Sequence, residues 1–511
     1  MSGPRAPLLV DQLRFMASEL GDELAYRDLD AEHAITFAQW DARSNQVARW
    51  LIDRGVTKGD RVAIYLPSDQ CLQWITSYAA IHKAGAVMVP VNTRLSSGEV
   101  LAILNHAEPT AMFTCDALDA TTRAVQRDIT TLSAVLNADG ARDGMAGWDE
   151  TTSFDAGDVQ VAVDDDDMAD IMYTSGTTGL PKGVLVRHRN VAMIPNCSPA
   201  WSGRGWLHGA PLFTFAGMSF IYNPMKMGLF GCYMPKFDVN HWFDVMERDR
   251  PMMVFLVPAM AELITASPRF DDADLSAPVA VSVGSAPLAP ATLLKLQDKM
   301  PQASVSNSYG LTEAGPAYIV MPKEEIRRRV GSVGKPIPPA EAKVVDPETH
   351  EQLGAHEVGE LLVRLPGKRR EYYKDDDATT RTWTEDGWLR SGDLAYVDED
   401  GFIYISGRMK DMIIRGGNNV YATDVEAVIL EHDAVQEAAV AGVPHTVLGE
   451  DVGAWIVCKP GETLDEDALK AFCADRLADY KRPSVVHFVD ELPRNATGKL
   501  MKHKLPGRGP S

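Results

Sequence analysis

The sequence predicts an α/β fold, with a large N-terminal domain built on parallel-rich sheets and a small, mobile α/β domain at the C-terminal end. Three observations support this expectation. The chain has 511 residues, which is too long for one hydrophobic core. Strand and helix patterns alternate from residue 61 onward, as in parallel sheets joined by helices. A second, shorter series of strands and helices begins after residue 407, so we expect domains at 1–408 and 409–511.

The first series of elements is regular. Apolar runs and amphipathic segments predict, in chain order, a strand, a helix, a strand, a helix and a strand at 61–67, 70–85, 86–92, 96–109 and 111–115. Ser96 stands at the start of the second helix as its cap. Because a helix connects each strand to the next, we expect these strands to be parallel.

A short apolar run then leads into a loop of small and hydroxylated residues, in the segment IMYTSGTTGLPKGVLVRH at 171–188. Such a loop offers N–H groups and hydroxyls to phosphate oxygens, and Lys182 adds a positive charge. The Walker pattern needs a glycine where Pro181 stands, so this loop is of another kind. The four aspartates at 164–167 are expected to form a solvated connector, because adjacent carboxylates cannot all face one ion.

Later elements complete both domains. Apolar runs that end in small residues predict strands delivering loops to one shared cleft, at 251–258, 277–288 and 303–315. In the C-terminal domain the pattern predicts a helix, two strands, a helix and a strand at 423–432, 437–443, 451–459, 466–480 and 485–490. The basic tail at 499–511 is expected to be mobile.

Composition argues against several classes of protein. With 71 acidic and 50 basic residues the chain has a net charge of -21, which disfavours a nucleic-acid binder. The six cysteines are scattered, without the spacing of a zinc site or a disulfide framework. No apolar run reaches the roughly 18 residues of a membrane span, and no secretory signal is evident. We therefore expect a cytoplasmic protein.

Five segments together resemble those of the adenylate-forming superfamily, in its acyl-CoA ligase type. They are YTSGTTGLPKG, GSAPL, YGLTE, WLRSGDLAYVDEDGFIYISGR and PRNATGKL, in the order found in that family. The resemblance implies a ligase that uses ATP, Mg²⁺ and coenzyme A. A carboxylate attacks the α-phosphorus of ATP, giving an acyl-adenylate and pyrophosphate. The thiol of coenzyme A then displaces AMP.

The resemblance also assigns roles in nucleotide binding. The β- and γ-phosphates would be bound by the loop residues Thr174, Ser175, Gly176, Thr177, Thr178, Gly179 and Lys182. The adenine would contact Gly284, Ser285, Ala286, Asn307 and Ser308, and would stack on Tyr309. Thr312 would bond an α-phosphate oxygen, and Glu313 together with Thr177 would hold Mg²⁺. Asp393 would accept the ribose hydroxyls, and Arg408 would also reach the ribose.

The catalytic lysine implied by the resemblance is Lys499, which would bridge the acid and the α-phosphate. The resemblance also places Lys410 at the hinge position between the two domains. After adenylation the small domain would rotate and remove Lys499. Gly416 and Gly417 would then line a narrow channel for pantetheine, because neither adds a side chain.

The substrate pocket implied by alignment is lined by Thr214, Ala216, Phe220, Met260, Val283, Ser308 and Ala317. These side chains are small or apolar and none is charged, so we expect a hydrophobic carboxylic acid. Medium- or long-chain, aryl-alkanoic and polycyclic (steroid side-chain) acids all remain open. A packed core would use the same residue types. The segment PLFTFAG lacks the aspartate that an amino-acid substrate needs, and also the histidine common in the family.

Other functions fit the sequence less well. A free-standing adenylation enzyme that loads a carrier-protein thiol is the main alternative. A luciferase-like oxygenase is less favoured. An AMP-sensing scaffold would be expected to lose Lys499 or Glu313, and both are present. No triad-like motif supports a hydrolase. Among partners we expect the acid, ATP and coenzyme A but no nucleic acid, and a homodimer is left open.

Overall fold

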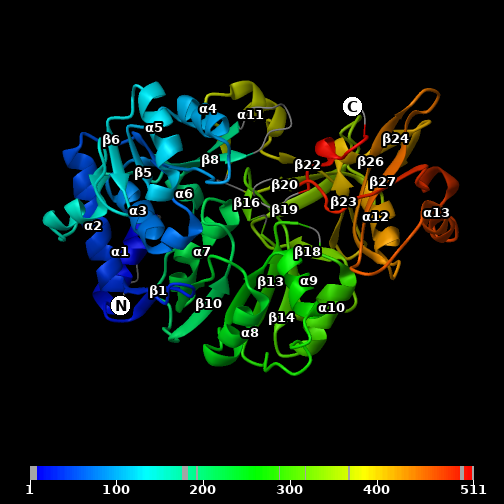
Figure 1. The fold of residues 1–511 in the computed structure, drawn as a ribbon, viewed down its shortest axis with the longest axis horizontal. Helices are drawn as coiled ribbons and strands as arrows, with labels where there is room; N and C mark the ends of the chain where they lie inside the picture. Colours follow the sequence, from blue (N-terminus) through cyan, green and yellow to red (C-terminus); the bar gives the residue numbers. More distant parts are fainter. Residues whose placement is uncertain are drawn as a thin grey trace. The chain divides into compact units, whose positions relative to one another are not determined.

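The computed structural model describes residues 8–174, 182–191, 194–286, 288–316, 318–365, 369–494 and 500–508. The chain forms two units (Figure 1). The first comprises Met1–Val330 and Leu365–Gly387, and the second Gly331–Arg364 and Trp388–Ser511. The domain boundary expected after residue 408 stays a prediction.

The first unit contains two large sheets. One has the strand order β14 (Ser304–Ser308), β13 (Ala280–Gly284), β12 (Met253–Leu256), β10 (Arg204–His208), β11 (Leu229–Tyr233), β1 (Leu24–Asp28) and β2 (Ala34–Thr36). Neighbouring strands of this sheet are parallel, except that β1 and β2 are antiparallel to each other. The three predicted strands that end in small residues are thus adjacent, and their carboxyl ends lie at one edge.

The second sheet carries the segment at 171–188. Its strand order is β21 (Glu371–Tyr372), β9 (Lys182–Arg187), β8 (Met168–Thr174), β4 (Val87–Pro90), β3 (Arg61–Ile64), β5 (Ala111–Thr114), β6 (Ala134–Asn137) and β7 (Ala146–Gly147). From β8 to β7 the neighbours are parallel, whereas β9 is antiparallel to both β8 and β21. The predicted α/β class with parallel-rich sheets is therefore confirmed.

Helices connect and cover these sheets (Figure 1). They are α1 (Leu9–Glu19), α2 (Phe37–Asp53), α3 (Cys71–Lys83), α4 (Ser97–Ala107), α5 (Asp119–Asp128), α6 (His188–Val191), α7 (Phe215–Lys226), α8 (Val239–Arg248), α9 (Pro258–Ala266), α10 (Pro290–Lys299) and α11 (Asp376–Thr382). The predicted cap of α4 is confirmed, because the Ser96 hydroxyl accepts from the Glu99 N–H and the Glu99 carboxylate accepts from the Ser96 N–H. In the described part of the chain, none of the helices combines the length and apolar character needed to cross a bilayer.

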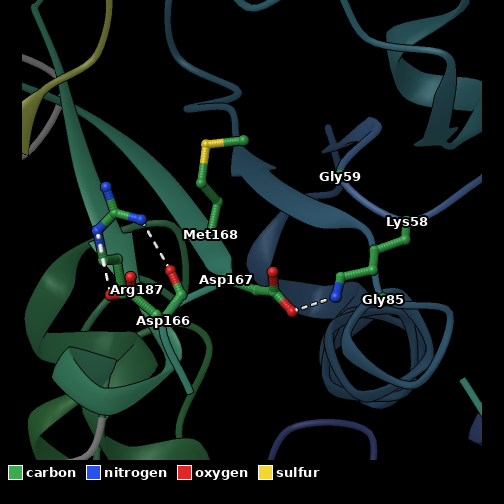
Figure 2. Close-up of a pocket in the computed structure, with 7 residues that line it drawn as sticks. All are labelled: Lys58, Gly59, Gly85, Asp166, Asp167, Met168 and Arg187. Atoms are coloured by element: carbon green, nitrogen blue, oxygen red, sulfur yellow. Dashed lines mark hydrogen bonds and ion pairs between the residues drawn. The ribbon is translucent and has the colours of Figure 1, made fainter. Parts of the chain in front are cut away.

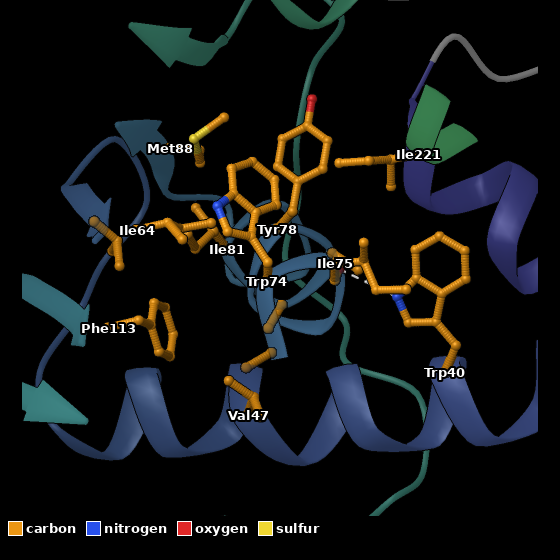
Figure 3. Packing of buried hydrophobic residues seen from close by; sticks show 14 of the residues in the cluster. Trp40, Val47, Ile64, Trp74, Ile75, Tyr78, Ile81, Met88, Phe113 and Ile221 are labelled. Atoms are coloured by element: carbon orange, nitrogen blue, oxygen red, sulfur yellow. Dashed lines mark hydrogen bonds between the residues drawn. The ribbon is translucent and has the colours of Figure 1, made fainter. Parts of the chain in front are cut away.

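Alternate residues of β3 face opposite layers of the core. Ile64 belongs to the cluster that includes α2 and α3, whereas Ala63 belongs to the cluster that includes α4. Figure 3 shows Trp40 of α2 and Trp74 of α3 in the first of these clusters. The Trp40 indole N–H donates to the carbonyl of Ile75 at 3.2 Å, so this large ring is buried without losing its hydrogen bond.

Two smaller sheets form most of the second unit. The antiparallel sheet has the order β18 (Ser332–Pro336), β23 (Ile403–Arg408), β22 (Leu389–Val397), β20 (Gly359–Arg364) and β19 (Glu341–Val345). The other contains β25 (Asn418–Val420), β24 (Ile413–Arg415), β27 (Gly449–Cys458) and β26 (Val435–His445), and β28 (Val485–Phe488) runs parallel to β27. Helices α12 (Ala422–Leu430) and α13 (Glu466–Ala474) complete the expected series.

Two expectations for the C-terminal region were wrong. The helix expected at 466–480 ends at Ala474, because the Arg482 guanidinium donates to the carbonyls of Ala474 and Leu477 and so replaces helical partners. The tail is not mobile throughout. Leu505 is buried in a cluster with Trp455, whose indole N–H donates to the carbonyl of Pro506 at 2.7 Å.

Candidate active site

The predicted phosphate loop lies between two paired strand ends. Thr174 is the last residue of β8 and Lys182 the first of β9, and the two are partners in the antiparallel register. Five predicted ligands between them in sequence lie outside the described residues: Ser175, Gly176, Thr177, Thr178 and Gly179. Of the predicted loop residues, the structure therefore describes Thr174 and Lys182, which lie at its two ends.

Tyr372 connects this loop to the YGLTE motif. Tyr372 pairs with Val184 of β9, and the Nζ of Lys182 lies 5.5 Å from the centroid of its ring. The Tyr372 hydroxyl donates to the Oε1 of Glu313 at 2.9 Å. Burial and the nearby Glu313 charge raise the pKa of Tyr372, so this hydroxyl keeps its proton. The side chain of Tyr372 thus connects Lys182 and Glu313, which are 131 positions apart in the sequence.

Thr312 is held through its main chain. The Nη1 of Arg370 donates to the carbonyl of Thr312 at 2.8 Å. A short antiparallel pair, β15 (Gly310–Leu311) and β16 (Gly315–Pro316), encloses Thr312 and Glu313 in the connecting turn. Arg370 and Tyr372 were both missed in the sequence. Their partners lie 58 and 59 residues away, and no local pattern marks such a contact.

The predicted adenine residues come together at the carboxyl ends of β13 and β14. Gly284 is paired with Ser308, which follows Asn307 in β14, and the hydroxyls of Ser282 and Ser308 lie 2.8 Å apart. A Cβ at Gly284 would approach both the carbonyl of Ser308 and the ring of Phe255 at 3.3 Å. Glycine therefore avoids two tight contacts at this position.

Three predicted adenine residues follow those strand ends. Ser285 and Ala286 come directly after β13 and are exposed. Ser285 has φ 76°, in the left-handed region that serine seldom adopts. Tyr309 comes directly after β14 and is half-buried. The carboxyl ends of β13 and β14 thus present side chains to solvent where the resemblance places the adenine.

Three of the predicted acyl-pocket residues, Thr214, Ala216 and Phe220, lie at the start of α7 or within it. Ala216 packs against a cluster that contains Phe220 and Phe255, whose ring centroids lie 4.7 Å apart. Thr214 caps α7, because its hydroxyl oxygen accepts from the Gly217 N–H at 3.1 Å.

The remaining pocket predictions are more scattered. Met260 lies beside Gly209, where an added Cβ would meet its methyl carbon at 3.2 Å. Val283 is wholly buried within β13. Ala317 lies outside the described residues. The structure thus gathers Ala216 and Phe220 on one helix, and the pocket assignment itself stays a prediction.

The second unit holds the other predicted nucleotide residues. Asp393 of β22 and Arg408 of β23 are cross-strand partners joined by an ion pair of 2.6 Å. Lys410 follows in a short 3₁₀ helix and is exposed. The catalytic prediction, Lys499, lies outside the described residues.

Gly416 and Gly417 form the turn between β24 and β25, with φ 57° and 86°. Two successive residues with positive φ suit a tight hairpin of this kind, and glycine adopts that conformation without strain. The turn therefore explains both glycines, and a role in a pantetheine channel stays a prediction.

A surface depression of about 290 Å³ lies away from the phosphate loop (Figure 2). It borders Met168 at the start of β8, about 20 Å along the strand from Thr174. The two cations that line it already have partners within the protein. Lys58 pairs with Asp167 at 2.6 Å, and Arg187 donates to the carbonyl of Asp166 at 2.7 Å. This depression is therefore a poor candidate for the nucleotide site. The same contacts show the acidic run at 164–167 partly ion-paired.

Comparison with known proteins agrees with this arrangement of motifs. The family model described as AMP-binding enzyme matches residues 14–373, and that of the AMP-binding enzyme C-terminal domain matches residues 424–499. The chain belongs to the AMP-binding enzyme family. This confirms the resemblance seen in the sequence.

Relatives of the chain in this family include several CoA ligases. A methyl-dioxo-octahydro-indenyl-propanoyl:CoA ligase of Rhodococcus jostii (strain RHA1) is 34% identical over 96% of this chain and 97% of its own. A long-chain-fatty-acid–CoA ligase of Bacillus subtilis (strain 168) is 30% identical over 90% and 87%. The solved structure of ATP-bound MatB from Rhodopseudomonas palustris has a TM-score of 0.85 at 29% identity, over 98% of each chain. The predicted class of AMP-forming acid–thiol ligase is confirmed at the level of the family.

Proposed function

We propose that this AMP-binding enzyme is an ATP-dependent acid–CoA ligase that activates a hydrophobic carboxylic acid. The reaction has two half-reactions. The acid carboxylate attacks the α-phosphorus of ATP and expels pyrophosphate, and the sulfur of coenzyme A then attacks the acyl carbon and expels AMP. The two steps need no reactant besides ATP, the acid and the thiol.

The observation that carries the proposal is the contact chain from Lys182 through Tyr372 to Glu313. It joins the end of the phosphate loop to the acidic residue of the YGLTE motif. The first half-reaction brings two anions together, so it needs a fixed cation and fixed donors near the phosphates. Lys182 supplies the cation and Thr174 a hydroxyl.

Glu313 fits the binding of Mg²⁺. A carboxylate is a hard oxygen ligand, and Mg²⁺ on a nucleotide commonly uses one or two protein carboxylates together with phosphates. The Tyr372 hydroxyl fixes one oxygen of Glu313, and Thr177 would be a second protein contact. When bound, the metal ion offsets phosphate charge.

The second unit would contribute Asp393 and Arg408 to the ribose. Lys499 would act on the carboxylate and the α-phosphate during adenylation, with Lys410 as the hinge for its withdrawal. This part rests on the family resemblance. It gives Lys499 a role in the first half-reaction only.

The substrate class is supported by the aromatic cluster beside Ala216. Phe220 and Phe255 are buried and form a wall without charge, which suits an apolar acyl group. The relatives act on a bulky fused-ring propanoate and on long-chain fatty acids. We therefore favour a large apolar acid over a short one.

Release of pyrophosphate across a panel of acids tests the proposal, with ATP and with coenzyme A or a pantetheinylated carrier protein as thiol. We expect acid-dependent release and a thioester of coenzyme A. Lys499→Ala should cripple adenylation but spare thioester formation from supplied acyl-adenylate. Transfer to the carrier alone would instead support the carrier-loading alternative. The absence of acid-dependent release from the whole panel would overturn the proposal.

A further inference from the structure

Arg370 is a buried guanidinium directly behind the predicted metal ligand. Its exposed fraction is 2%, and it stands two residues before Tyr372. The Trp383 indole N–H donates to the Arg370 carbonyl at 2.8 Å, which fixes the main chain at this point. The side chains of Arg370 and Tyr372 therefore reach the YGLTE motif from the same short segment.

The guanidinium joins two distant parts of the first unit. Its Nη1 donates to the carbonyl of Thr312 at 2.8 Å and its Nη2 to the carbonyl of Asn190 at 2.6 Å. Asn190 in turn donates to the carbonyl of Arg369 at 2.8 Å. Because the guanidinium is planar and its donors are fixed in a fork, it sets the distance between the two carbonyls.

In the described part of the chain, the charge of Arg370 has no direct counter-ion. Among the described residues, no carboxylate forms an ion pair with it. Burial lowers its pKa to about 10, opposed first by the charge of Asp170 and then by Tyr78 and Glu313. A guanidinium with this pKa stays protonated at neutral pH. Its charge therefore persists inside the unit, near the carboxylate that we assign to Mg²⁺.

The surroundings are shaped to this side chain. A Cβ at Gly315 would lie 2.9 Å from its Nη2, and Gly315 has φ 74°. The ring of Phe215 lies 5.1 Å from the guanidinium carbon, within the range of a cation–π contact. Asp170 and Tyr222 line, together with Arg370, a cavity of about 20 Å³, which has room for one water molecule.

We propose that Arg370 is a positioning residue for adenylation, which holds the Thr312 carbonyl so that Thr312 and Glu313 face the nucleotide and its metal ion. The inference rests on the proposed function. Arg370 fixes the main chain of the Thr312–Glu313 peptide, while Tyr372 fixes the Glu313 carboxylate. Together they restrain both the position and the direction of the metal ligand.

The first test removes the fork and keeps its bulk. Arg370→Met should lower the rate of acid-dependent ATP–pyrophosphate exchange by about 100-fold, the loss typical of a misplaced catalytic group. The Mg²⁺ concentration for half-maximal exchange should rise. Thioester formation from supplied acyl-adenylate should change little, because that step does not need the metal ion. Arg370→Lys, which can reach only one carbonyl, should fall between Arg370→Met and the wild type.

The matched control is Arg369→Met, which removes the same charge from the neighbouring, exposed side chain. It should retain the Mg²⁺ dependence of the wild type. Folding of each variant is checked by circular dichroism. Should Arg370→Met fail to fold, Arg370→Lys decides the matter by the same Mg²⁺ titration.

Equal losses in both half-reactions, or an unchanged Mg²⁺ requirement in the folded variants, would show that Arg370 only supports the fold. That result differs from failure of the proposed function. In that case the wild-type enzyme itself would show no acid-dependent exchange.

Discussion

The Nε of Arg408 lies 2.6 Å from the Oδ1 of Asp393, across the paired strands β22 and β23. The Asp393 side chain is 4% exposed, whereas the Arg408 side chain is 45% exposed. The carboxylate is therefore buried and held in one orientation, while much of the guanidinium faces solvent. An acceptor fixed in this way suits the hydroxyl pair of a ribose.

The first prediction follows from that orientation. Asp393→Asn keeps the shape of the side chain but removes its charge, so it should weaken hydrogen bonds to ribose hydroxyls. A hydrogen bond to a charged group is worth about 1.5–3 kcal/mol, and we expect the KM for ATP to rise by roughly 10- to 100-fold. Pyrophosphate exchange measured against ATP concentration gives this value.

Nucleotides that lack one ribose hydroxyl provide the control. The wild type should discriminate against 2′- and 3′-deoxy-ATP, and Asp393→Asn should lose much of that preference. Glu399→Gln removes an exposed carboxylate nearby in sequence and should behave as the wild type. Unchanged discrimination in Asp393→Asn would remove Asp393 from the ribose site.

The local pattern of the sequence predicted most elements, because strands and helices are marked by short periodic runs and caps. The helix after Ser96 and the strands before Thr174 and Gly284 are examples. The end of α13 could not be predicted in this way. It depends on Arg482, which reaches back to the carbonyl of Ala474 from outside the helix.

The candidate site was predictable where its residues lie within a recognisable motif. Glu313 and Lys182 were singled out for that reason, and their roles stay predictions. Tyr372 and Arg370 were not, since their contacts with Glu313, Thr312 and Asn190 span 58 to 180 residues and their own surroundings carry no motif. The conformation of Ser285 was equally hidden, because serine gives no sign of a positive φ.

Backbone strain at Ser285 leads to the second prediction. Its φ of 76° lies in the left-handed region, which costs a residue with a side chain about 1–2 kcal/mol. Glycine avoids this cost but gains freedom in the unfolded chain. Ser285→Gly should therefore raise the free energy of unfolding by up to about 1 kcal/mol, and Ser285→Val should lower it.

Thermal and urea unfolding of the variants measure this order. Ser304→Gly, in the extended strand β14, is the matched control and should destabilise the protein instead. A Ser285→Gly variant that is less stable than the wild type would show that its left-handed conformation is not strained in the folded protein.

The third prediction concerns pH. His208 is buried, and its ring lies 2.8 Å from the hydroxyl of Tyr26. Burial lowers its pKa from 6.5 to about 3. As the pH falls below 6.5 the unfolded chain binds a proton that the folded chain does not, so stability is lost progressively down to about pH 3. The full loss is on the order of 5 kcal/mol, from 1.36 kcal/mol per pKa unit.

Replacement of His208 isolates this contribution. His208→Gln should lower stability at pH 7 but reduce the slope of the urea midpoint between pH 6.5 and 3. His33→Gln, at an exposed position, is the control. His188, whose pKa is also lowered to about 3 by burial, should retain its own share of the slope in both variants. An unchanged slope in His208→Gln would contradict the assignment.

The last prediction concerns the size of the acid. Ala216 lies in the first turn of α7 and packs against the cluster of Phe220 and Phe255. Under the proposed function its small side chain leaves room for acyl atoms, and Ala216→Trp would fill that room. Intrusion into a packed site costs about 1–3 kcal/mol, so kcat/KM for the largest accepted acid should fall by roughly 5- to 160-fold.

Shorter acids do not reach the filled region, so they should be affected much less, and the KM for ATP should stay near that of the wild type. The ratio of kcat/KM values across a homologous series of acids measures the effect, once circular dichroism has shown that the variant folds. Ala216→Val, with a smaller added volume, should shift the preferred length less than tryptophan does. A proportional loss for every acid would place Ala216 in the core, because a general disturbance of the cluster cannot distinguish one chain length from another.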